Sequence, residues 1–161
     1  MERDAATAPD STGRRAAIDD GPVGPGSLGS VTNQERLREF HRIVDGYVPD
    51  GPRIPDPATL ALRRALVEEE AAEVREAFDR LLAAPTDDHL VALARELADL
   101  LYVVYGTFVV AGIDADAVVE EVHAANLRKR SGPRRADGKQ LKPDGWSPPD
   151  VRRVVFGDRA R

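Results

Sequence analysis

Residues 58–84 read ATLALRRALVEEEAAEVREAFDRLLAA, and residues 88–111 read DHLVALARELADLLYVVYGTFVVA. Both stretches are rich in Ala and Leu, contain no Pro, and repeat apolar residues at helical spacing. We therefore predict two long helices, separated by Pro85, Thr86 and Asp87, which end the first helix and cap the second. The second helix is apolar on more than one side, which is typical of a helix at the centre of a bundle or shared with a second subunit.

Two shorter helices are expected on either side of this pair. Thr32 and Glu35 have the spacing of a capping box, and the helical pattern that follows them stops near Gly46. Asp114 is placed to cap a further helix that reaches about Arg130. Four helices with short connections and no strand signal predict an all-α, four-helix bundle.

The two ends of the chain differ from this helical region. In residues 1–30, Gly, Pro and Ser make up 11 of the 30 positions, so we expect a disordered tail that buries too little apolar area to fold. Residues 31–130 form the helical domain. Residues 131–161 are expected to form an irregular, basic, Pro- and Gly-rich arm that contributes to the site.

The composition narrows the class of protein. The chain has 161 residues, about one domain, and 42% of them are hydrophobic. It has no Cys, which excludes disulfides, thiolate zinc sites and cysteine nucleophiles. A net charge of −5 argues against a general nucleic-acid binder, and no apolar run approaches the ~20 residues of a membrane span. We expect a cytoplasmic domain with no nucleic-acid or membrane partner.

Acidic residues occupy an unusual place on the two long helices. At 100° per residue, three of them follow the edge of the apolar stripe of the first helix, and two lie on the apolar face of the second. These five are Glu69, Glu70, Glu73, Glu96 and Asp99. Glu68 falls on the solvent side and is excluded. The pattern predicts five carboxylates that point into one bundle.

Buried carboxylates without partners are costly, so this arrangement needs a compensating charge. No Lys or Arg shares the inward arcs near them, apart from Arg80 more than a turn away. A divalent cation is the simplest partner, and a carboxylate set without thiolates favours Mg²⁺ or Mn²⁺ over zinc. The alternative is a solvated acidic helix face.

A basic segment follows the last expected helix. Seven of the 15 residues from 128 to 142 are cationic, opposed only by Asp137. An acidic metal pocket together with a basic segment suits a polyphosphate, because the metal and the cations can share the neutralisation of its charge. A solvated C-terminal arm is the alternative for each of these cations taken singly.

Two spaced motifs carry a resemblance to a known family. Residues 69–73, EEAAE, have the form EExxE, and residues 96–99, ELAD, have the form ExxD. The pair resembles the signature of the all-α nucleoside triphosphate pyrophosphohydrolases, which include MazG-like proteins, phosphoribosyl-ATP pyrophosphohydrolase and the dimeric dUTPases. Residues 39–41, 99–107, 121–129, 137–139 and 142–149 look like the MazG-like branch close to bacterial dUTPase-like enzymes. The resemblance covers roughly residues 33–150 and departs at Ala125 and Trp146.

The resemblance implies metal-dependent cleavage between the α- and β-phosphates of a nucleoside triphosphate. Residue by residue, it makes Glu70, Glu73, Glu96 and Asp99 ligands of Mg²⁺, with Glu69 a further ligand or the group that orients the attacking water. It suggests Asn126 and Lys129 for contact with the nucleotide, and Lys139 and Lys142 are weaker candidates for contact with its phosphates. His123 is a further candidate, with a histidine at a subunit interface as the alternative. The resemblance also suggests a dUTP-like deoxynucleotide as substrate and a homodimer or homotetramer as the assembly.

Two other classes of protein remain to be weighed. A di-iron carboxylate bundle needs two Glu-x-x-His motifs, and Glu120-x-x-His123 is the only one in the chain. A non-catalytic bundle that binds nucleotide or metal as a sensor, or serves only as an interaction module, stays open, although all five acidic residues of the motifs are intact.

Overall fold

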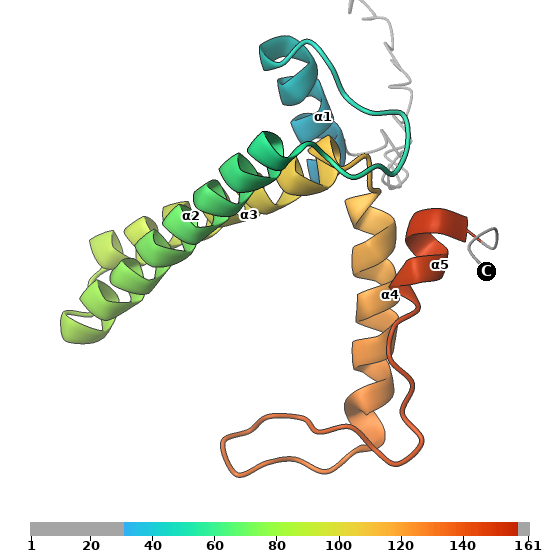
Figure 1. Ribbon diagram of the computed structural model, residues 1–161. Helices are drawn as coiled ribbons and strands as arrows, with labels where there is room; N and C mark the ends of the chain where they lie inside the picture. Colours follow the sequence, from blue (N-terminus) through green and yellow to red (C-terminus); the bar gives the residue numbers. More distant parts are fainter. Residues whose placement is uncertain (1–30, 158–161) are drawn as a thin grey trace, which may run out of the picture. The chain divides into compact units, whose positions relative to one another are not determined.

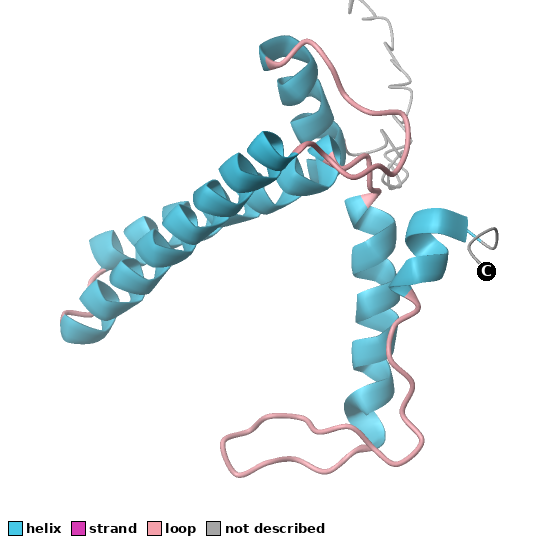
Figure 2. Cartoon of the chain, in the orientation of Figure 1, coloured by secondary structure: helices cyan, strands magenta, loops and turns pink. Residues whose placement is uncertain are grey.

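The computed structural model describes residues 31–157. Its elements in chain order are α1 (Asn33–Val44), α2 (Pro57–Ala83), α3 (Asp87–Val110), α4 (Ala115–Leu127), the 3-10 turn η1 (Arg128–Ser131) and α5 (Val151–Phe156) (Figure 1). Figure 2 shows helices joined by loops, and among the described residues the only β-type pairing is an isolated bridge between Arg134 and Gln140. The expected all-α fold is confirmed. The tail expected at residues 1–30 lies outside the described residues.

Capping residues fix where the helices begin. The Thr32 hydroxyl accepts a hydrogen bond from the Glu35 backbone N–H at 3.2 Å, and the Glu35 carboxylate accepts one from the Thr32 N–H at 2.7 Å. This is the predicted capping box. α2 begins at Pro57 behind the N-cap Asp56, and Thr86 caps α3. Each expected helix start is therefore found within one or two residues.

α2 and α3 form a long antiparallel hairpin, seen as the green and yellow helices that run side by side in Figure 1. Val74 and Ala77 on α2 pack against Leu93 on α3, with Leu81 and Leu100 at the edge of this cluster. Burial of these side chains between the two helices supplies most of the stability of the hairpin. Neither helix would be stable alone.

α1 packs on the second half of α3. Leu37 meets Val109, which is fully buried, together with Val48 from the connector, and Tyr105 covers the group. The buried Gln34 side chain ties α1 to the start of α4, because its amide donates to the Ile113 carbonyl at 3.0 Å and its oxygen accepts from the Ala115 N–H at 3.3 Å.

A glycine sets the turn between α3 and α4. Gly112 has a φ of +66°, and a Cβ there would lie 2.0 Å from the carbonyl oxygen of Gly51. The connector runs this close because the Arg53 N–H donates to the Ala111 carbonyl at 2.9 Å. α3 and the helical stretch that follows this turn meet at a bend of 113°.

The C-terminal arm is more ordered than its sequence indicates. The α-helical part of the fourth helix ends at Leu127, and η1 carries the helical path to Ser131. The arm then returns along α4: the Trp146 indole N–H donates to the Ala125 carbonyl at 2.9 Å. α5, capped by Asp150, packs on α4 and was not expected from the sequence.

No single helix among the described residues has the length and apolarity to cross a membrane. α3 and the helical stretch Ala115–Ser131 are together long and apolar enough, by length and composition only, but they are bent by 113° where they meet.

Candidate functional site

Three carboxylates from the α2–α3 hairpin converge on one point. Glu70 on α2 and Glu96 and Asp99 on α3 each present an oxygen, and these atoms all lie within 4.8 Å of one another. The spacing arises because residues three apart on α3 share a face, and that face is set against α2. We call these three residues the carboxylate cluster.

The other two predicted acids flank the carboxylate cluster. The Glu73 carboxyl shares a hydrogen bond with Glu96, and the charge of Glu69 acts on both Glu70 and Glu73. The expected burial of Glu96 is confirmed, since only 3% of it is exposed. Glu69, Glu73 and Asp99 are exposed, so the expectation that all five point inward is wrong. The group opens to solvent along one side of the hairpin.

Burial and mutual repulsion act on the protonation of these groups. The pKa of Glu70 is raised, first by loss of solvation and then by the charges of its acidic neighbours, Glu73 before the others. The pKa of Glu73 is raised by loss of solvation and by the charge of Glu96. Loss of solvation and the charges of neighbouring acids both disfavour the ionised forms of Glu70 and Glu73, and a bound cation would favour them.

Glu96 has a cationic partner that the helical wheel did not reveal. The Arg95 guanidinium donates to Glu96 Oε1 at 2.5 Å, although Arg95 itself projects from the other side of the backbone. This hydrogen bond is the main reason that the pKa of Glu96 is lowered in spite of burial. The sequence placed no Lys or Arg except Arg80 on the inward arcs, and Arg95 reaches Glu96 from outside those arcs.

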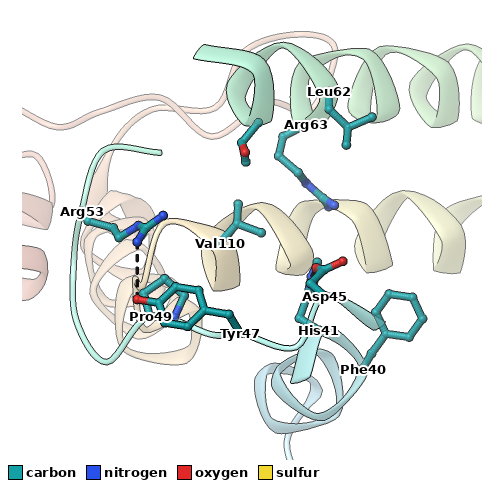
Figure 3. Close-up of a pocket in the computed structure, with 10 residues that line it drawn as sticks. Phe40, His41, Asp45, Tyr47, Pro49, Arg53, Leu62, Arg63 and Val110 are labelled. Carbon is teal, nitrogen blue, oxygen red and sulfur yellow. Dashed lines mark hydrogen bonds and ion pairs between the residues drawn. The ribbon is translucent and has the colours of Figure 1, made fainter. Parts of the chain in front are cut away.

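A pocket of about 340 Å³ lies at the other end of the hairpin, where α1, the connector and the first turns of α2 meet α3 (Figure 3). Its walls combine aromatic rings with charged groups. The lining residues include Phe40, His41, Asp45, Tyr47, Arg53 and Arg63. In Figure 3 the Arg63 side chain descends from α2 toward Asp45 and His41 on the α1 side. The volume is within the range of small-molecule sites.

Arg63 is the buried cation of this pocket. It is 9% exposed, and it donates from Nη2 to the Val103 carbonyl at 2.7 Å and from Nε to the Thr107 hydroxyl at 3.3 Å. Burial lowers the pKa of its guanidinium, and the Asp45 charge partly offsets this. α3 admits the guanidinium because residue 106 is Gly: a Cβ there would lie 2.5 Å from Arg63 Nη2.

His41, 4% exposed, has a fixed orientation next to Arg63. Its Nδ1 lies 2.5 Å from a carboxylate oxygen of Asp45, and a carboxylate only accepts, so Nδ1 carries the proton. Nε2 is then an acceptor in the neutral ring. Nε2 faces α3 at Gly106, where an added Cβ would lie 3.0 Å from it.

The family model for phosphoribosyl-ATP pyrophosphohydrolase matches residues 37–126, more than half of the chain. The chain belongs to this family. The matched segment begins in α1, ends in α4 and includes the carboxylate cluster. Membership indicates a pyrophosphohydrolase that acts on nucleotide triphosphates, and it agrees with the resemblance that the spaced motifs showed. No curated protein matches the chain.

The other residues predicted for this pyrophosphohydrolase, those expected to bind the nucleotide, contact groups outside the carboxylate cluster. Lys129 donates to the Asn126 side chain at 2.6 Å, and Lys142 stacks over the Trp146 ring at 4.3 Å. Lys139 lies in the arm and His123 is exposed on α4. Within the described part of the chain, none of the hydrogen bonds or ion pairs recorded for these residues reaches a carboxylate of α2 or α3. Their role in nucleotide binding stays a prediction.

Arg63 and Arg95 are the two site residues that sequence reasoning missed. At 100° per residue Arg63 falls beside Val67 and Val74 on the inner side of α2, so its burial had a signal in the sequence. Arg95 had none, because it projects outward and reaches Glu96 only through the length of its side chain.

Proposed function

We propose that the chain is a Mg²⁺-dependent nucleoside triphosphate pyrophosphohydrolase, for which Mn²⁺ substitutes. Water hydrolyses the bond between the α- and β-phosphates, and the products are a nucleoside monophosphate and pyrophosphate. The observation that carries the proposal is the convergence of Glu70, Glu96 and Asp99 within 4.8 Å, inside the segment that matches the pyrophosphohydrolase family.

The donor set fits a hard divalent cation. All three groups offer carboxylate oxygens, and the chain has no Cys to provide softer ligands. Glu70, Glu96 and Asp99, joined by Glu73, would hold the ion, which when bound neutralises phosphate charge and lowers the pKa of a water molecule. Glu69, exposed at the edge, is assigned either as a further ligand or as the carboxylate that orients the attacking water.

We assign the nucleoside end of the substrate to the pocket around Arg63. Arg63 precedes Glu70 by seven residues on one helix, which places the pocket roughly 10 Å from the carboxylate cluster along α2. This span suits a nucleoside whose phosphates lie on the cluster. The Phe40 and Tyr47 rings offer faces on which a base can stack, and Arg53 lies over the Tyr47 ring at 5.4 Å.

The polar groups of this pocket support a dUTP-like substrate. Arg63 offers its Nη1 donor, and His41 Nε2 is an acceptor. A uracil-type base presents a ring N–H between two carbonyl oxygens, which pairs with one acceptor and one donor of this kind. Cytosine presents an amino donor and an accepting ring nitrogen in the opposite order along this edge, so it would pair with the same two groups only after a shift of one position. The resemblance to the dUTPase-like branch points to the same substrate class.

The basic arm supplies the second part of the proposed substrate site. We assign contact with the nucleotide to Asn126 and Lys129, whose side chains are linked to each other, and contact with the phosphates to Lys139 and Lys142. His123 is retained as a further candidate on α4. Their cationic and amide groups are suited to phosphate and sugar oxygens.

We also propose that the enzyme assembles as a homodimer or homotetramer. α3 leaves large apolar side chains uncovered in the single chain, among them Leu90, Val91, Leu97 and Leu101. An apolar patch of this kind is typical of a surface that a second subunit covers. Size-exclusion chromatography with light scattering measures the mass directly, and a monomer at all concentrations contradicts this part of the proposal.

The test of the function is pyrophosphate release from a panel of NTPs and dNTPs, measured with Mg²⁺, with Mn²⁺ and with EDTA. We expect metal-dependent pyrophosphate and an equal amount of monophosphate, fastest with dUTP. Glu96→Gln should lose the activity. Arg64→Gln changes an exposed residue that pairs with Glu68 on the solvent side and should keep it.

Each other outcome of this assay has a definite meaning. Release of orthophosphate would show that another phosphate bond is cleaved. Nucleotide binding without turnover in any metal would support the non-catalytic bundle instead. Equal rates with all pyrimidine nucleotides would refute the dUTP-like preference while leaving the reaction intact.

A further inference from the structure

Arg95 is the only cationic side chain among the described residues that forms an ion pair with a member of the carboxylate cluster. Its Nη2 atom lies 2.5 Å from Glu96 Oε1. The two partners differ in burial: the Arg95 side chain is 72% exposed and that of Glu96 is 4% exposed. An exposed cation is thus paired with a buried anion.

This pair gives the buried Glu96 carboxylate a cationic partner. A buried carboxylate without a partner is costly, and Glu96 lies within 4.8 Å of the carboxylate oxygens of Glu70 and Asp99. The Arg95 hydrogen bond outweighs the effect of burial on the pKa of Glu96. Asp99 and Glu73 in turn stabilise the guanidinium charge, so Arg95 interacts with both sides of the cluster.

A divalent cation held by Glu70, Glu96 and Asp99 would need an oxygen of the same Glu96 carboxylate. It would also place two further positive charges close to the Arg95 guanidinium. The two cations therefore compete for one buried anion. Because the Arg95 side chain is mostly exposed, it can leave by rotation of its own bonds, and no backbone movement is required.

We propose that Arg95 is the internal counter-ion of the metal-free centre, which neutralises Glu96 until a divalent cation displaces it. The proposal rests on the proposed metal site and concerns a positioning residue. Arg95 sets how tightly the centre binds its metal and protects Glu96 while the centre is empty. It also prevents the group of acids from destabilising the hairpin before the metal arrives.

Three variants of the full chain test this competition. In Arg95→Gln, we expect the dissociation constant for Mn²⁺, measured by electron paramagnetic resonance and calorimetry, to fall three- to tenfold. Partly exposed ion pairs contribute about 1 kcal/mol, which corresponds to such a change. Arg64→Gln removes the same charge from an exposed pair on α2, and its Mn²⁺ affinity should stay within about twofold of wild type. Glu96→Gln should bind Mn²⁺ at least tenfold more weakly.

Thermal unfolding gives a second, independent readout. In EDTA, Arg95→Gln should unfold at a lower temperature than wild type, because Glu96 has lost its partner. In saturating Mg²⁺ the two proteins should unfold at the same temperature, because the ion has replaced Arg95 in both. The loss of stability of the metal-free protein and the gain in metal affinity should then be equal in free energy, because both measure the same coupling between Arg95 and the metal.

The outcomes separate this proposal from the proposed function. If Glu96→Gln binds Mn²⁺ as wild type does, the metal site itself is wrong. If Glu96→Gln loses the metal but Arg95→Gln binds it no more tightly than wild type, the counter-ion role is wrong and the metal site stands. A deficit in unfolding temperature that persists in saturating Mg²⁺ would also overturn the proposal, because Arg95 would then stay bonded to Glu96 in the loaded protein.

Discussion

Replacement of Gly106 by Ala probes the pocket from the α3 side. An added Cβ would lie 2.5 Å from Arg63 Nη2, closer than packed atoms allow, and 3.0 Å from His41 Nε2, a tight contact. Arg63 must shift, and its hydrogen bond to the Val103 carbonyl, 2.7 Å long, is lost or stretched. A hydrogen bond of a charged group contributes about 1.5–3 kcal/mol, whereas Ala in place of Gly stabilises a helix by about 1 kcal/mol.

The net loss of stability expected for Gly106→Ala is about 0.5–2 kcal/mol, or roughly 1–8 °C in Tm for a domain of this size. Urea and thermal unfolding followed by circular dichroism measure it. The sharper test repeats the substitution in an Arg63→Met background, where the close contact with the guanidinium is gone. There Ala should be neutral or stabilising. A loss of the same size in both backgrounds would refute the reasoning, because the cost would not come from Arg63.

Three further substitutions test the pocket, the acids and the turn. Tyr47→Ala should raise the KM for the nucleotide roughly tenfold, because a stacking face is lost, and should not change the affinity for Mn²⁺. Phe78 is an exposed aromatic residue on the outer part of α2, and Phe78→Ala should change neither quantity. Glu73→Gln should abolish turnover. Because the pKa of Glu73 is raised, its contribution to stability is present below its unfolded pKa of about 4.5 and is lost as the pH rises through the folded pKa. In EDTA at pH 7 the variant should therefore unfold at or above the wild-type temperature. Its unfolding temperature should also depend less on pH. Gly112→Ala should destabilise the fold by about 3 kcal/mol or more, since its Cβ would meet a backbone carbonyl at 2.0 Å, whereas Gly46→Ala, with a similar φ of +70° and nothing within 4 Å, should cost only the roughly 1 kcal/mol of the backbone conformation.

The helices of this protein are predictable because local signals agree with one another. Capping side chains at Thr32, Asp56, Thr86 and Asp114 mark the starts, and the apolar spacing between them marks the lengths. α5 escaped prediction because it is a helix of six residues, too short to show a period. Its position depends on contacts with α4, which no local pattern encodes.

The acids of the site were predictable to the extent that helical position determines burial. Glu96 lies in the middle of an apolar face, and the structure buries it there. The same reasoning placed Glu73 and Asp99 inward, where the structure leaves them exposed. On a helical wheel of 100° per residue, a side chain about 60–80° from the centre of the apolar face is buried in a core of four helices. The same side chain stays exposed where only two helices pack together. The difference is a matter of tertiary packing rather than of sequence period.

The charges that balance these acids lie beyond the reach of a helical wheel. A wheel places the Cβ atom, and for a short side chain this also places the charge. Arg95 starts outside the cluster and ends on Glu96 Oε1, and Arg63 extends from α2 across to the Val103 carbonyl on α3. Both arginines therefore carry a charge into a region that their sequence position does not identify. Arg95 lies outside both motifs, so the charge balance of the carboxylate cluster depends on a residue that the motifs do not contain.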